Sequence, residues 1–229
     1  MTKKQSVELV DFLKRYCSEE WILLIKSYIQ TENYKKGERI FHEGDKVKNV
    51  YFINTGKVKI VSYFNRENER ILRLSHHGEL LGHRAFKSAR YPISAEALCD
   101  SKITSLPIDK YVKLIKGNSE LSVFLLEFYA SDLRNTEERM INIIHNEVIV
   151  RIGIIICMLI DAYGYENDKS KKLAFMLSRS DIANFAGTAY ESVIRNIAKL
   201  EELGLVQVVG KGLIISKEKE LRKFINKKS

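Results

Sequence analysis

The 229-residue sequence predicts an α+β protein with an N-terminal antiparallel β-roll of the jelly-roll type, a long dimerisation helix and a C-terminal winged helix-turn-helix. Three observations predict this order of elements. Short β-branched and aromatic runs, separated by glycine and polar clusters, fill residues 34–108. A stretch of about thirty residues without glycine or proline starts at Asn118. After residue 177, two short amphipathic segments joined by a glycine precede two alternating strands.

The composition favours a folded protein that meets an anionic partner. Hydrophobic residues make up 45% and aromatic residues 10% of the chain, which is ample for packed cores. The formal net charge is +9 and the pI is about 9.3, which favours a nucleic acid or an acidic surface as partner. Residues 146–229 hold 14 Lys and Arg against 10 Asp and Glu, and residues 1–145 hold 24 against 19. The excess is spread along the chain, so total charge does not locate a binding face.

The cysteines and the apolar runs bear on the cellular compartment. Cys17, Cys99 and Cys157 are far apart and no Cys-x-x-Cys pair occurs, which argues against a disulfide framework or a thiolate metal cluster. Residues 1–16 lack the continuous apolar core of a signal peptide. The most apolar run, residues 148–160, contains an arginine and is too short to span a bilayer. We therefore predict a protein of the reducing cytoplasm with no membrane partner.

The first elements are a helix and several strands. Residues 7–30 predict a helix with an interrupted apolar stripe formed by Val7, Val10, Leu13, Ile22, Ile25 and Ile29. In the strand "KVKIVSYF", Val58 and Ile60 face away from Lys57 and Lys59, which is the alternation of a half-buried strand. Several such strands at short spacing predict an antiparallel roll or sandwich.

The stretch from Asn118 predicts one long helix, over residues 118–145. Its apolar residues recur at helical spacing, and Ser119 can cap its start. Two interpretations compete for this helix: it is buried inside a larger core, or it pairs with a second copy of itself. We favour the pair, although the polar middle "SDLRNTEERM" would disturb a regular heptad repeat.

The remaining elements follow in order. Residues 148–163 predict a strongly apolar helix, residues 165–172 predict a loop, and the lysines of the last few residues predict a solvated tail. In the C-terminal unit, Ser178 is the expected N-cap of a short helix, with Asp181 three residues later. Gly187 ends this helix, and Thr188 is expected to cap the next.

The second helix of this unit has one face to bury and one face left over. Its expected inner residues are Val193, Ile197 and Leu200. The opposite face carries Tyr190, Glu191, Ile194 and Arg195, with Ser192 and Lys199 at its flanks. Arginine can donate two hydrogen bonds to guanine, glutamate can accept from cytosine, and an apolar side chain can contact a thymine methyl group. Glu191 and Arg195 are four residues apart, so we expect a salt bridge between them. An ordinary exposed helix pair is the alternative interpretation.

A hairpin after this helix favours DNA as the partner. The segment "LGLVQVVGKGLIIS" reads as two alternating strands around a tip that carries Lys211. A helix-turn-helix followed by a hairpin is a winged helix, and Lys211 is placed to contact phosphate. Ser178 and Arg179, at the start of the first helix, could contact phosphate as well. The DNA-binding residues expected from the sequence are Ser178, Arg179, Thr188, Tyr190, Glu191, Ser192, Ile194, Arg195 and Lys211.

These residues resemble a known family. The string "SRSDIANFAGTAYESVIRNIAKLEELGLV" is similar to the helix-turn-helix signature of the cyclic-AMP receptor protein and fumarate–nitrate regulator (Crp/Fnr) family of bacterial transcription factors. The string "YKKGERIFHEGDKVKNVYFINTGKVKI" is similar to the family's cyclic-nucleotide-binding β-roll. The resemblance implies a sensor roll with its N-terminal helix (1–117), a dimerisation helix (118–145) and a winged helix-turn-helix (146–229). It also implies a homodimer on a near-palindromic DNA site, with RNA polymerase and an unknown small-molecule effector as further partners.

The resemblance is weaker where a cyclic nucleotide would bind. Gly78 and Glu79 match the start of the family's phosphate cassette, but Tyr91-Pro92 stands where an Arg-Ser or Arg-Thr pair is expected. A cyclic phosphate needs a fixed cation, and Arg84 or Arg90 could supply it only from another position. The weak ligand candidates are therefore Gly78, Glu79, Arg84 and Arg90. We predict no cofactor and no gating by cyclic AMP, with a nucleotide-gated activator as the alternative.

Other chemistries find less support. The family's iron–sulfur members need a cluster of N-terminal cysteines, and only Cys17 is present there. The remote alternative is a cupin-like metalloenzyme, because a β-roll resembles a cupin barrel. Adjacent histidines on a strand point to opposite faces, unlike cupin ligands. We therefore predict neither a metal site nor a catalytic residue, after weighing His42, His76, His77, Glu79 and His83 as ligands.

Overall fold

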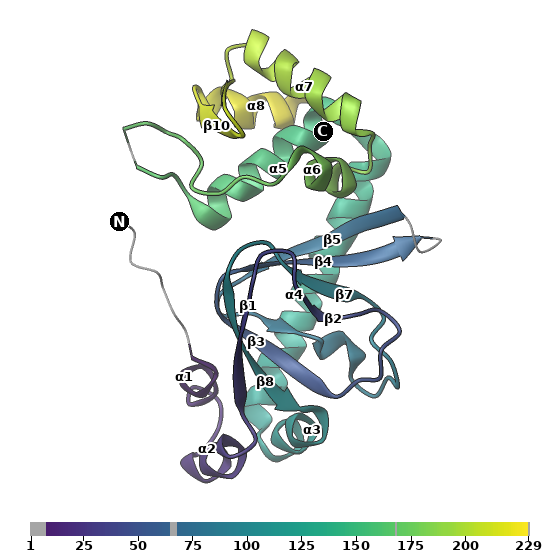
Figure 1. The fold of residues 1–229 in the computed structure, drawn as a ribbon, viewed down its shortest axis with the longest axis vertical. Helices are drawn as coiled ribbons and strands as arrows, with labels where there is room; N and C mark the ends of the chain where they lie inside the picture. Colours follow the sequence, from purple (N-terminus) through teal and green to yellow (C-terminus); the bar gives the residue numbers. More distant parts are fainter. Residues whose placement is uncertain (1–7, 65–67, 168, 229) are drawn as a thin grey trace. The chain divides into compact units, whose positions relative to one another are not determined.

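The computed structural model describes residues 8–64, 68–167 and 169–228 (Figure 1). The chain divides into two compact units, an N-terminal unit of residues 3–131 and a C-terminal unit of residues 132–229. The division falls inside a long helix, and each unit has a core of its own.

Two short helices, rather than the one expected over residues 7–30, open the N-terminal unit. They are α1 (Leu9–Leu13) and α2 (Glu19–Lys26). The expected single helix is wrong because Ser18 has extended backbone angles (φ −66°, ψ 160°) and starts a new helix, as serine favours at an N-cap. Both helices still bury their apolar side chains in one core with Phe52 and Leu106 of the roll. Val7 lies outside the described residues.

Two antiparallel four-stranded sheets form the β-roll, as the sequence predicts. The first has the order β1-β8-β3-β6 and the second the order β2-β7-β4-β5. The strands are β1 (Gln30–Tyr34), β2 (Arg39–Phe41), β3 (Asn49–Thr55), β4 (Lys57–Phe64), β5 (Asn68–His76), β6 (Leu80–Leu81), β7 (Ser94–Ala97) and β8 (Ser101–Pro107).

The interior of the roll is filled by apolar side chains from both sheets. Ile53 and Ile103 of the first sheet pack with Val58 and Ile60 of the second, and all four are nearly inaccessible to solvent. Val58 and Ile60 point inward as the alternation of β4 predicts, while Lys59 lies on the other face of the same sheet.

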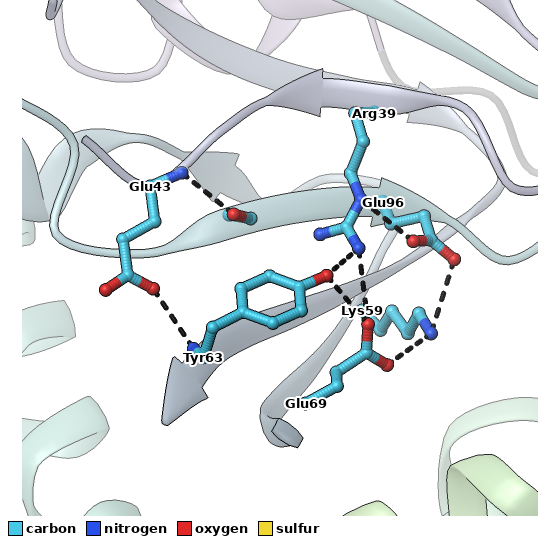
Figure 2. Close-up of polar contacts among 7 residues, drawn as sticks. Arg39, Glu43, Lys59, Tyr63, Glu69 and Glu96 are labelled. Atoms are coloured by element: carbon cyan, nitrogen blue, oxygen red, sulfur yellow. Dashed lines mark hydrogen bonds and ion pairs between the residues drawn. The ribbon is translucent and has the colours of Figure 1, made fainter. Parts of the chain in front are cut away.

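A charged network covers that other face (Figure 2). Lys59 is only 7% exposed, and its Nζ lies 2.6 Å from Glu69 and 3.3 Å from Glu96. Arg39 binds the same two carboxylates, at 3.2 Å and 3.0 Å, and also contacts the Tyr63 hydroxyl. Two cations and two anions thus neutralise each other across four strands, because a buried charge is tolerated only when it is paired.

A helical connection leads from the roll to the C-terminal unit. It consists of α3 (Ile108–Gly117), which the sequence did not predict, and α4 (Ser119–His145), which matches the long helix expected over 118–145. Leu121 and Leu125 of α4 are buried in the core that holds α1 and α2.

The C-terminal unit is built around the apolar helix α5 (Val148–Tyr163), as expected. After the loop come α6 (Arg179–Ala186), α7 (Tyr190–Glu202) and the strands β9 (Val206–Val209) and β10 (Gly212–Ile215). α5 packs against α6 and α7. Within the described part of the chain, every helix is too short or too polar to cross a bilayer.

At the C-terminus a helix lies where the sequence predicts a tail, while the side chains of Lys227 and Lys228 lie outside the described residues and their solvation stays a prediction. This helix, α8 (Glu218–Lys228), forms because Leu221 and Ile225 lie one turn apart and are buried against Gly153 of α5. Arg222 adds a 2.6 Å ion pair with Asp161.

Candidate DNA-binding site

α6 and α7 form a helix-turn-helix whose first helix is capped as predicted. The Ser178 hydroxyl accepts a hydrogen bond from the Asp181 amide at 3.0 Å and donates one to the Asp181 carboxylate at 2.6 Å. Gly187 ends α6 with left-handed backbone angles (φ 62°, ψ 47°), which glycine adopts without steric cost.

The predicted cap of the second helix is wrong. α7 begins at Tyr190 and its N-cap is Ala189, whose methyl side chain cannot accept a capping hydrogen bond. The physical reason is that the Thr188 amide donates to the Ala183 carbonyl at 3.0 Å, so Thr188 belongs to the turn that closes α6. Thr188 is half-buried in that turn.

The two faces of α7 are divided as the sequence predicts. Val193, Ile197 and Leu200 are buried against the rest of the C-terminal unit. Tyr190 is 51% and Ile194 44% exposed, although both are large side chains, and Glu191 and Arg195 beside them are also exposed. Ser192 is half-buried at the flank, and Lys199 is exposed one turn beyond Arg195.

The expected ion pair between Glu191 and Arg195 is wrong. Among the described residues, Arg195 instead donates from Nη2 to the Ser192 hydroxyl at 3.2 Å. An exposed pair of this kind stabilises a helix by only about 0.3–0.5 kcal/mol, so a bond to the nearer hydroxyl can replace it. The Glu191 carboxylate therefore remains able to accept hydrogen bonds from a binding partner.

The hairpin β9–β10 is the predicted wing. Its strands pair with Val209 opposite Gly212, which leaves Gly210 and Lys211 as a two-residue tip. Gly210 has φ 58°, and a tight hairpin turn favours glycine at such a position. Lys211 is exposed at the tip. Glu201 of α7, which sequence reasoning missed, accepts a hydrogen bond from the Val208 amide at 2.7 Å and so ties the wing to α7.

Arg179 has a donor without a partner. It is the first residue of α6 and is half-buried, and this burial lowers the pKa of its guanidinium. Its Nη1 is shielded from solvent and has no hydrogen-bond partner among the described residues. Such a donor is suited to an incoming anion, and Ser178 beside it is exposed.

A second arginine, Arg139 of α4, was not foreseen from the sequence. Its Nη2 donates to the Phe185 carbonyl at 3.1 Å, and its guanidinium lies 4.0 Å from the centre of the Phe185 ring. Burial lowers the pKa of Arg139 to about 10, which leaves it charged at neutral pH. Arg139 is one of several charged residues in a polar stretch of helix, and no spacing in the sequence distinguishes it as a contact residue.

Two of the four weak ligand candidates of the roll have other partners. Glu79 lies 3.2 Å from the His76 ring, and Arg90 donates to the Gly44 carbonyl at 2.6 Å. Gly78 forms the turn before β6, and Arg84 is exposed on the short 3-10 helix His83–Ala85.

Tyr91 stands where the resemblance leads one to expect a cation. It is 3% exposed and stacks on Phe41 with ring centres 4.3 Å apart. Its hydroxyl donates to the Asn49 carbonyl at 2.6 Å. This part of the roll is therefore closed by an aromatic side chain.

The histidines weighed as metal ligands lie in different surroundings. His83 is 1% exposed and packs edge-on against Phe128, whereas His42 is exposed. Burial lowers the pKa of His77, which is next to His76. Within the described ranges, no group of three His, Cys, Asp or Glu side chains could hold a metal ion.

Two family models match the chain, one for each unit. The cyclic nucleotide-binding domain matches residues 31–118, and the Crp-like helix-turn-helix domain matches residues 150–224. The second match contains the whole of α6, α7 and the wing.

Curated relatives cover most of the chain. The transcriptional activator protein Anr of Pseudomonas aeruginosa is 25% identical over 187 residues, which is 82% of this chain and 77% of that protein. The electron transport regulator A of Shewanella oneidensis is 24% identical, over 82% of this chain and 75% of that protein. The fumarate and nitrate reduction regulatory protein of Salmonella typhimurium is 22% identical, over 79% and 72%.

Solved structures share the fold. FixK2 from Bradyrhizobium japonicum superposes with a TM-score of 0.75 at 19% identity, over 85% of this chain and 96% of that one. A putative Crp/Fnr-family regulator from Eubacterium rectale superposes with a TM-score of 0.77 at 16% identity, over 96% and 100%. A roll and a winged helix-turn-helix, matched in this order by sequence and by fold, identify the chain as a member of the Crp/Fnr family of bacterial DNA-binding transcription regulators.

Proposed function

We propose that the chain acts as a homodimer that reads a near-palindromic DNA site with two copies of α7. The observation that carries this proposal is the outer face of α7, where Tyr190, Glu191, Ile194 and Arg195 are exposed while the inner face is buried. These side chains can meet thymine methyl groups, cytosine amino groups and guanine acceptors in a major groove. Two such helices bind half-sites about one helical turn apart.

The basic groups around α7 support the orientation of this face toward DNA. Lys211 is exposed at the wing tip, and the shielded Nη1 of Arg179 has no partner within the described part of the chain. Phosphate oxygens of DNA would accept hydrogen bonds from both of these side chains. Contacts of this kind set the register of the protein on the duplex, while α7 supplies the sequence preference.

An apolar stripe on α4 supports the homodimer. Its exposed side chains follow the alternating spacing of three and four residues that is typical of a coiled coil, with Leu126 70% and Ile144 66% exposed. Ala130 is a small apolar residue at one position of the stripe, and Glu137 is the one charged residue on it, because the other polar residues of the middle segment lie on other faces of the helix. The apolar members are Val123, Leu126, Leu133, Met140 and Ile144.

Selection of bound duplexes from a random pool tests the function directly. We expect one enriched sequence with two inverted half-sites, and a complex mass that corresponds to two chains per duplex. A variant with both Glu191→Ala and Arg195→Ala is the control, because these side chains are exposed and their loss should leave the fold intact. Enrichment of no sequence, or a complex with one chain per duplex, would contradict the proposal.

We also propose that cyclic AMP does not gate this regulator and that it requires no cofactor. The support is the buried Tyr91 and the apolar filling of the roll by Phe41, Ile53, Val58 and Leu81. A calorimetric titration of cyclic AMP into the purified protein should give no saturable heat at millimolar concentration. Saturable binding near one nucleotide per chain would favour the alternative, a nucleotide-gated activator. As parts of the same proposal, we expect the chain to act in the cytoplasm, to contact RNA polymerase and to respond to a small-molecule effector other than cyclic AMP.

A further inference from the structure

The C-terminal half of α4 contacts the helix-turn-helix at the point where α6 ends. Arg139 donates to the Phe185 carbonyl at 3.1 Å and covers the Phe185 ring at 4.0 Å. Phe185 is 3% exposed and lies in the last turn of α6. The last carbonyls of a helix lack partners within the helix and carry partial negative charge, so a guanidinium stabilises them.

The turn itself is approached from α4 and α5. A methyl group built on Gly187 would lie 3.7 Å from Arg151 Nη1 and 3.9 Å from Ile143 Cγ2. Ile143 lies one turn after Arg139 on the same helix. Arg139 therefore contacts the end of α6, and Ile143 and Arg151 lie close to the turn before α7, all within the C-terminal unit.

The helix that makes these contacts also carries the apolar stripe. Met140 is 59% exposed and Ile144 66%, whereas Arg139 beside them turns toward Phe185. Successive residues of a helix point about 100° apart. One face of α4 can therefore carry the stripe that contacts a second copy, while Arg139 on another face contacts α6.

We propose that Arg139 is a positioning residue that fixes the direction of α7 relative to α4, and thereby the half-site spacing that the dimer accepts. This inference rests on the proposed function, because spacing has meaning only for a dimer that reads two half-sites. Arg139 contacts no base. Its loss leaves the outer face of α7 unchanged and lets α6 and α7 tilt on α4.

The test compares one selected DNA site in several forms. The probes are the full site, a single half-site, and full sites with the spacer one or two base pairs shorter or longer. Arg139→Met keeps the aliphatic bulk and removes the guanidinium. Arg134→Met is the matched control, because Arg134 is an exposed arginine on the same helix. The mass of each variant in solution verifies that it remains a dimer.

We expect Arg139→Met to bind the full site about tenfold more weakly, as for the loss of a charge-assisted hydrogen bond. Half-site binding should change less than about twofold, since no base contact is lost. The ratio of affinities between the natural and altered spacers should fall toward one. Arg139→Lys, which restores a cation over the ring, should recover part of that ratio, and Arg134→Met should match the wild type.

Other outcomes would overturn the inference. A folded Arg139→Met protein with the wild-type spacing preference would show that the contact does not position α7. Equal losses on full site and half-site would mean that Arg139 only supports the fold. If Arg139→Met does not fold, Arg139→Gln takes its place, because glutamine stays polar at this half-buried position but is shorter than arginine and carries no charge over the Phe185 ring; an unchanged spacing preference there would overturn the inference too. A wild-type protein that binds only as a monomer would refute the proposed function, and it would be detected before any variant is made.

Discussion

Arg195 is the residue on which the base-reading hypothesis can be tested most sharply. Its side chain is exposed on α7, and its guanidinium is steadied by one hydrogen bond to Ser192. We expect Arg195→Ala to weaken binding to the selected site by about 1–3 kcal/mol and to relax the preference at one base pair. Fluorescence titrations on the selected site and its single-base variants measure both effects.

The control for this prediction is Arg195→Lys. Lysine keeps the positive charge but lacks the fork that bonds two guanine acceptors together. If Arg195 reads a base, the lysine variant should lose the same preference as the alanine variant. Full recovery by lysine, with equal affinity changes on every sequence, would assign Arg195 to phosphate.

Individual site residues were predictable to different degrees. The exposed face of α7 follows from helical spacing alone, because three buried residues at intervals of four and three define the opposite face. The partner of Arg195 did not follow from spacing, since weak exposed contacts of similar energy compete within one turn. Arg139 could not be predicted because its partner, Phe185, is 46 positions away along the chain.

At the scale of elements, the wing offers a charge that can be removed without touching a core. Lys211 lies at the exposed tip of the hairpin. We expect Lys211→Ala to lower affinity for all sequences alike and to reduce the slope of log affinity against log salt by about one. Titrations at several salt concentrations test this, with Lys219→Ala on α8 as a control of equal charge. A changed base preference with the same slope would contradict the assignment of Lys211 to phosphate.

The docking of α8 should depend on pH. Hydrogen bonds from Tyr165 and Arg222 hold the pKa of Glu218 below its usual value. A lowered pKa stabilises the fold above the unfolded pKa of about 4.3, and this stability is lost as pH falls through the folded pKa. Glu218→Gln should therefore reduce the free energy of unfolding at pH 7 by no more than about 1 kcal/mol, because the pair is partly exposed.

Urea unfolding at pH 7 and at a series of lower pH values measures this difference. The wild type and Glu218→Gln should converge as the pH falls below the folded pKa of Glu218, because the carboxyl group is then protonated in both folded and unfolded chains. Glu220→Gln is the control on the same helix, because Glu220 is exposed. A gap between wild type and Glu218→Gln that persists at low pH would contradict an electrostatic origin.

Elements at the two ends of the chain were the hardest to predict. The apolar stripe over residues 7–30 continues through the break between α1 and α2, so periodicity alone did not reveal two helices. At the other end, the many lysines make the segment read as polar, although Leu221 and Ile225 are buried and dock α8 on α5. The N-cap position of Ser18 decides the first of these structures, and a contact with the distant helix α5 decides the second.

At the scale of the whole molecule, the stripe on α4 predicts how the chain assembles. Leu133 is 59% exposed near the middle of the stripe. We expect Leu133→Lys to destabilise the dimer by about 2–4 kcal/mol, because each dimer loses the burial of two leucine side chains. Sedimentation measures the dissociation constant, and binding to the full site should fall toward that of a half-site.

A matched variant separates the stripe from a general effect of charge. Asn135→Lys adds the same charge to an exposed position off the stripe, and it should leave the dimer intact. The helical content of both variants should be that of the wild type, since both positions are exposed in the single chain. A dimer that survives Leu133→Lys unchanged would place the interface elsewhere.

The overall architecture was predictable because each of its parts has its own periodicity. Alternating strands, a long run without glycine or proline, and a helix-turn-helix before a hairpin appear in order along the chain. From the sequence, the polar middle of α4 was expected to disturb a regular heptad repeat. In the structure, Glu137 is the one charged residue of this segment that falls on the stripe. The structure shows which side chains of α4 are exposed on the stripe, and this exposure cannot be read from the sequence.

The charged network on the roll has a consequence for how this family member can evolve. Replacement of Lys59 alone would leave Arg39 to neutralise both Glu69 and Glu96, so one negative charge would stay uncompensated in a region that is largely shielded from water. A hydrophobic set of similar volume could replace all four charges together at little cost. Among its descendants and close relatives, Arg39, Lys59, Glu69 and Glu96 should therefore be inherited or exchanged as a group, and a lineage that has lost one of the four should have lost or reversed another.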